Sequence, residues 1–335
     1  MASGRSQKPL VFGNTRTSAT SLNWKTGENL RNCITGLAAI TAVITLASHA
    51  AAQNQQALIE RGSYLVNGPA GCGNCHTRKN PDLSPRADME LAGGERFDTP
   101  IFSAYSRNLT PDKETGIGTW SDLQIIRAMR EGVTKENDVL GPPMPVPTYH
   151  TMSDDDAKAI VAYLRTLKPV HNEVPESTYK IPLQPIPGAK GLPAPPKTDK
   201  VAYGSYLVNS IAHCLECHST PSARGEPDIE HQAGGGGFPL PVWPVLGAKP
   251  GTVIFSLNIT PDPETGIGTW TDEQIRRAIT DGIDKDGKQL FPLMPFAWFK
   301  RMTAEDLDAI VAYLHTLKPL KHKVEPNLTL QTLPR

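Results

Sequence analysis

An excess of charge of one sign is what this sequence most clearly lacks. Its 335 residues include 34 lysines and arginines and 34 aspartates and glutamates, so the formal net charge at pH 7 is +0. Proteins that bind nucleic acid, or that are steered as whole molecules toward a charged partner, usually carry a surplus of one sign. The composition therefore argues against a nucleic-acid partner.

Apolar and aromatic residues are also scarce. Hydrophobic residues make up 39% of the chain and aromatic residues 6%, whereas there are 28 glycines and 31 prolines. Average globular domains are richer in apolar residues. The side chains alone therefore supply little material for a large core.

Cysteine is rare, but four of the five cysteines stand in two copies of one short motif, CGNCH at residues 72–76 and CLECH at residues 214–218. In C-x-x-C-H, two thiols can add to the two vinyl groups of one haem while the adjacent imidazole reaches the iron. A thioredoxin-like pair would follow a strand in a βαβ unit, and a structural zinc site would need four closed ligands; the sequence offers neither context. We therefore predict two covalently bound haem c groups, held by Cys72, Cys75 and His76 in the first copy and by Cys214, Cys217 and His218 in the second. Each porphyrin would add the apolar surface that a small helical domain needs.

Residues 1–52 have the features of a targeting sequence. Lys25 and Arg31 precede an apolar run at residues 34–47, which is short for a bilayer span, and three alanines at residues 50–52 supply small side chains for cleavage. We predict a signal peptide over residues 1–52, with a retained membrane anchor as the alternative.

The fifth cysteine, Cys33, would leave with the signal peptide. Haem attachment would use the other four, so no disulfide could form. Export to an oxidising compartment, with the thiols reserved for haem, indicates the bacterial periplasm. A retained leader would associate the protein with the inner membrane.

The rest of the chain is an internal duplication. Tyr64 begins the sequence YLVN, which recurs at Tyr206, 142 residues later (206 − 64), and Glu114 begins ETGIGTW, which recurs unchanged at Glu264, 150 residues later (264 − 114). The second copy therefore holds eight extra residues (150 − 142), which we place in the Gly/Pro-rich stretch 234–252.

Local signals predict helices in both copies and no sheet. Helices are expected over residues 54–67 and 201–209, with Gly62 and Gly204 allowing another element to approach closely. Capping boxes at Ser121 and Thr271 begin a second helix in each copy, and a third begins at Ser153 or Thr303. The predicted fold is all-α, with one domain over residues 53–170 and another over residues 201–335. Residues 171–200, rich in proline, are expected to form an extended linker.

Two methionines are candidates for the sixth ligand of the iron. Met144 and Met294 occupy corresponding positions in the two copies, each beside prolines that restrict the loop. Such a loop suits a weak thioether ligand. We predict the axial pairs His76/Met144 and His218/Met294.

Met152 and Met302 are the competing pair. Each directly precedes a predicted helix cap, where an apolar residue commonly serves as a hydrophobic staple. A staple explains why both copies have this methionine, without any need for it to bind iron. Histidine ligands are disfavoured, because three further histidines have no histidine counterpart in the other copy: His150, His171 and His315.

The combination of motifs resembles one family over residues 58–170 and 200–320. GxYLV before CxxCH, then N-[LI]-T-P-D-x-x-T-G-I-G-T-W, then MP and a closing AIVAYLxTLKP are similar to the cytochrome c subunits of bacterial membrane-associated alcohol, gluconate and aldehyde dehydrogenases. The resemblance implies class I-like cytochrome c domains with low-spin His/Met haems. It also implies a periplasmic dehydrogenase catalytic subunit as electron donor. Several members of that family have three haem motifs, whereas this sequence has two.

We therefore expect a non-catalytic dihaem electron carrier that passes electrons to quinone, another cytochrome or an oxidase. Two alternatives belong to other classes: a dihaem peroxidase-type enzyme with one open iron site, and the haem subunit of a respiratory oxidase held by a retained anchor. No repeated acid, base or nucleophile constellation remains once the haem ligands are set aside, which disfavours an enzyme.

Overall fold

The computed structural model describes residues 49–324 apart from 81, 83, 100, 190, 192, 220–231, 237–239, 242–252 and 292. The chain divides into two compact units, Met1–Gln53 and Asn54–Arg335. The predicted apolar leader, Cys33 and most of the predicted insertion at 234–252 lie outside the described residues. Among the helices that are described, none is both long and apolar enough to cross a membrane.

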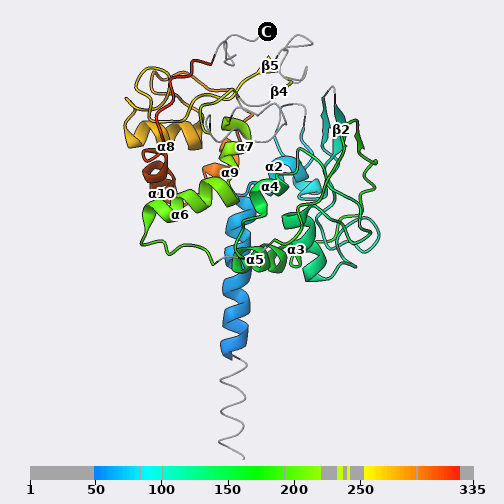
Figure 1. Ribbon diagram of the computed structural model, residues 1–335. Helices are drawn as coiled ribbons and strands as arrows, with labels where there is room; N and C mark the ends of the chain where they lie inside the picture. The colour runs from blue at the N-terminus through cyan, green and yellow to red at the C-terminus, as the bar shows by residue number, and fades with distance from the viewer. Residues whose placement is uncertain are drawn as a thin grey trace, which may run out of the picture. The chain divides into compact units, whose positions relative to one another are not determined.

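The second unit is mostly helical and contains the duplication as two halves (Figure 1). In the first half, a helix through residues 54–67 leads into these elements in order: α2 (Cys72–His76), η1 (Ala87–Met89), β1 (Arg96–Asp98), β2 (Phe102–Tyr105), α3 (Asp122–Glu131), α4 (Val146–Tyr149) and α5 (Asp154–Leu164). Strand β3 (Thr178–Tyr179) follows in the linker. The second half contains α6 (Lys200–Tyr206), the π-helical turn η2 (Leu207–Ile211), α7 (Cys214–His218), β4 (Leu240–Pro241), β5 (Val253–Ile254), α8 (Asp272–Asp281), α9 (Phe296–Phe299) and α10 (Ala304–Leu314).

Both predicted capping boxes are confirmed. At α3, the Ser121 hydroxyl accepts from the Gln124 backbone N–H, while the Gln124 side chain accepts from the Ser121 N–H. Thr271 and Gln274 repeat this exchange at α8. Each helix ends at a glycine in the left-handed region, Gly132 or its counterpart in the second half. These short-range bonds satisfy backbone donors that a helix end leaves free.

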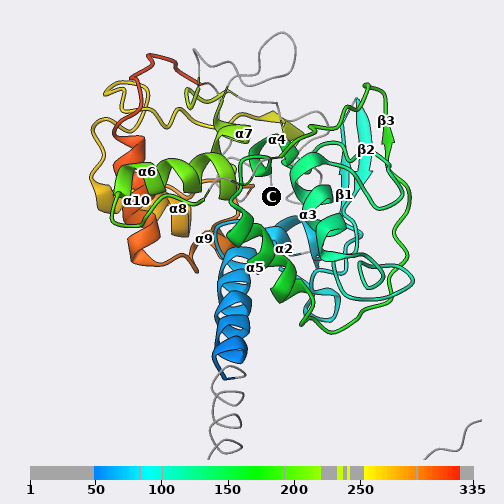
Figure 2. The same cartoon turned by 60° about the horizontal axis from the view of Figure 1, so that its bottom comes forward.

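The close approach predicted at the two helical glycines is also confirmed. A methyl group added at Gly62 would lie 1.8 Å from the carbonyl oxygen of Ala159 in α5. One added at Gly204 would lie 1.9 Å from that of Ala309 in α10. Figures 1 and 2 both show α6 lying beside α10. Only glycine lets the backbones pack at this distance.

The prediction that the chain contains no sheet was wrong. Strands β1, β2 and β3 form a small antiparallel sheet in which Phe97 pairs with Ala104 and Ser103 pairs with Thr178, at one side of the first half in Figure 2. β4 and β5 form a second, two-stranded sheet. The strands are two to four residues long. The turn that connects β1 and β2 is fixed by Thr99, whose hydroxyl accepts from the Phe102 N–H. An alternation of buried and exposed side chains does not define these strands.

The two halves pack directly against each other through a reciprocal pair of hydrogen bonds. Tyr64 of the first half donates to Asp306 of the second over 2.7 Å, and Tyr206 of the second donates to Asp156 of the first over 2.7 Å. Both carboxylates are buried, with Asp306 at 0% exposure. A single buried hydrophobic cluster includes residues from both halves. The linker is therefore not the sole connection between them.

Candidate haem-binding sites

Each C-x-x-C-H motif forms a one-turn helix, α2 or α7, directly after a tight turn. The Ala70 N–H donates to the Leu65 carbonyl over 2.9 Å, and the Ala212 N–H donates to the Leu207 carbonyl over 2.7 Å. The residue before each first cysteine has a positive φ, which is 55° at Gly71 and 42° at its counterpart His213. The duplicated sequence thus builds the same entry into both motifs.

The four motif cysteines are free thiols. Burial raises the pKa of Cys72, Cys214 and Cys217 to about 12 and that of Cys75 to about 11. Redox-active C-x-x-C pairs have a thiolate with a lowered pKa, so this environment argues against a thioredoxin-like site. Among the described residues there is also no group of three or more His, Cys, Asp or Glu side chains placed to hold a metal ion.

Each motif histidine is oriented by a backbone carbonyl. Nδ1 of His76 lies 2.7 Å from the carbonyl oxygen of Arg107, and Nδ1 of His218 lies 2.7 Å from that of Leu257. A carbonyl can only accept, so Nδ1 carries the proton and Nε2 keeps its lone pair for a metal. Burial lowers the pKa of both histidines, which favours the neutral ring that iron needs. Sequence reasoning did not identify these two carbonyls.

An asparagine directly follows each orienting carbonyl and fixes its loop. Oδ1 of Asn108 accepts from the Thr110 N–H over 2.9 Å, while Nδ2 donates to Thr115 over 3.0 Å and to the Val170 carbonyl over 2.8 Å. Asn258 makes the equivalent bonds in the second half. The repeated N-[LI]-T-P-D sequence was the available signal for this support. These asparagine bonds hold in place the backbone carbonyl that orients each histidine.

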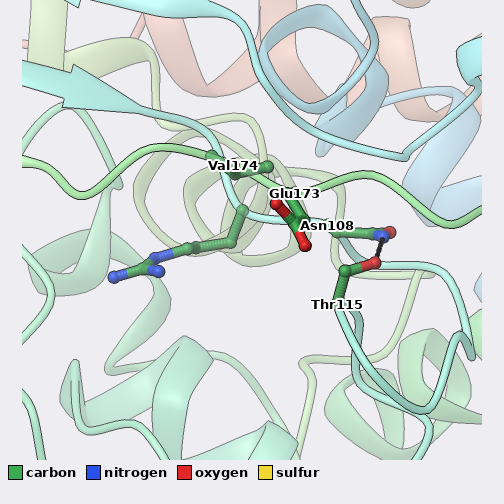
Figure 3. Close-up of a pocket in the computed structure, with 5 residues that line it drawn as sticks. Asn108, Thr115, Glu173 and Val174 are labelled. Atoms are coloured by element: carbon green, nitrogen blue, oxygen red, sulfur yellow. Dashed lines mark hydrogen bonds between the residues drawn. The ribbon is translucent and has the colours of Figure 1, made fainter.

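A surface hollow of about 300 Å³ lies behind this support in the first half (Figure 3). Its lining consists of Arg107, Asn108, Thr115, Glu173 and Val174, and the Asn108–Thr115 hydrogen bond crosses one side of it. The lining is mainly polar and comes partly from the linker. The hollow therefore belongs to the outer face of the histidine loop.

The structure separates the two candidate methionine pairs by burial. Met152 is 0% exposed and Met302 is 6% exposed, and each directly precedes a helix N-cap, as expected for a core staple. Met144 and Met294 are only partly buried and pack against the core from the loops that lead into α4 and α9. This difference favours Met144 and Met294 as the pair able to reach iron. Their ligand role remains a prediction.

The Met144→Ala variant is expected to lose part of the weak near-infrared sulfur-to-iron absorption of the oxidised protein, because one of two thioether ligands is removed. Covalent haem should stay in place, since both thiols remain. Met152→Ala is the matched control and should leave the band intact. The opposite pattern would assign the ligand role to the staple methionines.

The residues present fit haem c. Each motif offers two free thiols and a neutral imidazole with Nε2 available, and each half offers a partly buried methionine from a proline-restricted loop. Haem, when bound, supplies one-electron iron chemistry. The chain's own contribution is to position these partly buried groups.

Comparison with known proteins agrees with this chemistry. Residues 59–168 match the family model described as "Cytochrome c", so the chain contains a cytochrome c domain, and that family implies covalent haem c. The chain is also similar to cytochrome c subunits of dehydrogenases. It is 30% identical over 303 residues to the gluconate 2-dehydrogenase cytochrome c subunit of Pantoea cypripedii, covering 84% of this chain and 64% of that protein.

Two further relatives agree in class. The cytochrome c subunit of alcohol dehydrogenase (quinone) from Gluconacetobacter polyoxogenes is 29% identical over 285 residues, which cover 79% of this chain and 57% of that protein. A diheme cytochrome c-type protein of Cereibacter sphaeroides is 28% identical over 254 residues, covering 73% of this chain and 81% of that protein. The chain thus spans less than two thirds of the dehydrogenase subunits named here.

Proposed function

We propose that the chain is a dihaem cytochrome c that carries electrons from a partner dehydrogenase to quinone, another cytochrome or an oxidase. In this proposal residues 53–170 and 201–335 are two class I-like cytochrome c domains. The observation that carries it is the repeated histidine–carbonyl geometry: His76 and His218 meet corresponding backbone carbonyls at the same distance, 2.7 Å. A haem site in one half therefore predicts one in the other, as the similarity to a diheme cytochrome also suggests.

The proposed axial ligands suit an electron acceptor. Methionine opposite histidine raises the potential of haem relative to ligation by two imidazoles, which favours taking electrons from a flavin, quinone-type or molybdenum enzyme. With both axial positions filled by His76/Met144 and His218/Met294, neither iron would keep an open position for peroxide. The donor would bind transiently over a small area at an exposed haem edge.

The proposed location is the bacterial periplasm, where haem c is attached to exported chains. The leader at residues 1–52 motivates this proposal, with attachment to the inner membrane as the outcome if it is retained. Sequencing the mature N-terminus distinguishes these outcomes. A first residue at position 53 supports cleavage, whereas an intact leader supports an anchor.

The function is tested with the purified oxidised protein and a dehydrogenase encoded beside it. Mass spectrometry should first show two covalent haems. Alcohols, aldehydes and sugar acids should reduce the haems only when the dehydrogenase is present, and peroxide turnover should be negligible. Rapid oxidation of an organic substrate by the cytochrome alone would refute the carrier proposal. Rapid peroxide turnover would instead support the peroxidase alternative.

A further inference from the structure

The two haem-attachment motifs lie on either side of one tyrosine at the interface between the halves. Tyr149 in α4 donates from its hydroxyl to the carbonyl oxygen of Ala70 over 3.2 Å, just before the first motif. Its ring also meets the ring of His213, just before the second motif, edge to face at a centroid distance of 6.1 Å. Tyr149 is 4% exposed. One buried side chain therefore touches the entry to both motifs.

A tryptophan of the second half covers the first motif directly. A methyl group added at Gly73 would lie 3.0 Å from Nε1 of Trp298, and one added at Gly71 would lie 3.7 Å from Cβ of the same side chain. Trp298 is 9% exposed and belongs to α9, the counterpart of the helix that carries Tyr149. Gly73 inside the first motif and Gly71 just before it thus let an aromatic residue of the other half pack onto the backbone.

His213 also links Tyr149 to the second motif. Its Nδ1 lies 3.2 Å from the carboxylate of Glu216, which stands inside that motif. The ring that meets Tyr149 is therefore held by the motif that it precedes.

The surrounding interface is fixed by its reciprocal Tyr–Asp hydrogen bonds. The hydroxyl of Tyr64 also accepts from the Thr303 N–H over 3.2 Å, and that of Tyr206 accepts from the Ser153 N–H over 3.1 Å. Each tyrosine thus binds the first turn of the opposite half's last helix. These bonds restrict sliding of one half against the other, so the motif contact has one defined geometry.

We propose that this contact, with Tyr149 and Trp298 as positioning residues, is the internal electron route between the two haems. The inference rests on the proposed dihaem function. Cys72, Cys75, Cys214 and Cys217 would hold the two haems beside this contact, and the haems would supply the one-electron chemistry, so that an electron lost by one would reduce the other. No bond to the protein forms or breaks, and no second carrier is required. The two haems then act as one coupled unit and not as two separate carriers.

The test is the rate of electron exchange within single molecules of the full-length protein carrying two covalent haems. A Met144→His background lowers the potential of the first haem and separates the two spectra, because imidazole replaces the thioether. Flash reduction with less than one electron per molecule then lets equilibration between the haems be followed. We expect a phase whose rate does not depend on protein concentration.

The key variant is Tyr149→Ala combined with Trp298→Ala. It should slow the concentration-independent phase at least about tenfold, because the motifs lose the side chains that fix their positions and electron transfer slows steeply as the distance between the two haems grows. Tyr149→Phe keeps the ring contact with His213 and loses only the hydrogen bond to Ala70, so it should slow exchange less than the double variant. Tyr206→Phe is the interface control, since it removes a hydrogen bond between the halves without touching a motif. Equal slowing in this control would reduce the aromatic pair to a general packing role and overturn the proposal.

A milder variant keeps the test decisive if the double variant does not fold. His213→Gly gives the second motif the residue that the first has as Gly71, and φ at this position, 42°, suits glycine. It removes the ring contact with Tyr149 and should slow exchange while leaving both haems attached. Exchange that depends on protein concentration in the parent would overturn the inference even with two haems present. Fewer than two haems would instead refute the proposed function.

Discussion

Replacing Gly204 with alanine is expected to destabilise the folded protein by about 3 kcal/mol, because the added methyl group overpacks a helix contact that has no room. In an exposed helix the same change would stabilise by about 1 kcal/mol. Here the methyl group would lie 1.9 Å from the Ala309 carbonyl oxygen, which is backbone and cannot rotate away. Helix α6 would have to move off α10. Urea denaturation of the haem-loaded protein measures the loss.

Val201→Ala is the matched control in the same helix. Val201 is 42% exposed, so shortening it should change the free energy of unfolding by less than about 0.5 kcal/mol. Gly62→Ala should reproduce the Gly204 effect in the first half, since its methyl group would meet Ala159 in the same way. An alanine at Gly204 that stabilises the protein would show that the two helices do not pack this closely.

Asp306→Ala is expected to cost about 3 kcal/mol, because removing one member of a buried hydrogen-bonded set leaves its partners unsatisfied. Asp306 is 0% exposed and accepts from the Tyr64 hydroxyl and from Nζ of Lys197, both over 2.7–2.8 Å. Burial first, and the bond to Asp306 second, raise the pKa of Tyr64 to about 12, so this hydroxyl is a neutral donor at neutral pH. Lys197 is 40% exposed and regains water, so most of the loss comes from Tyr64.

Asp308→Ala, two residues further along α10, is the control, because it removes a carboxylate that is not buried in the interface. Asp308 is 39% exposed and pairs with Arg276 at 2.6 Å, so its removal should cost less than about 1 kcal/mol. Asp306→Asn should retain part of the stability, since the amide oxygen can still accept from Tyr64. Equal midpoints in urea for the alanine variants at 306 and 308 would contradict the interface described above.

Features that depend on neighbours in the sequence could be predicted. The capping box at Ser121 joins groups three residues apart, and Gly62 stands inside an otherwise regular helical pattern. The sheet could not, because Ser103 pairs with Thr178 of the linker and short strands show no alternation. The carbonyl of Arg107 that orients His76 could not be predicted from the sequence either. A backbone oxygen belongs to every residue, so residue type gives no signal for it.

The interface between the halves was missed for a related reason. Tyr64 and Asp306 are 242 residues apart, and neither stands in a pattern that implies a partner. The duplication indicates two similar halves but does not say which faces meet. Tyr149 could not be identified from the sequence either. Its counterpart in the second copy is Phe299, so the repeat does not mark this position as special. Its neighbours become visible only when both halves are placed together.

Because Lys197 of the linker pairs with Asp306, the second half cannot be moved to another protein as a module without part of the linker. In the first half the buried Asp156 pairs at 2.8 Å with Arg61, which lies in the first helix of the same half. The corresponding position in the second half is Tyr203, and Lys197 of the linker supplies the charge instead. A second half transplanted without residues 171–200 would keep its carboxylate but lose its counter-ion. The second half therefore depends on the linker for this ion pair. A graft whose boundary lies before Lys197 should keep the pair between Lys197 and Asp306, whereas a graft whose boundary lies after Lys197 should lose it.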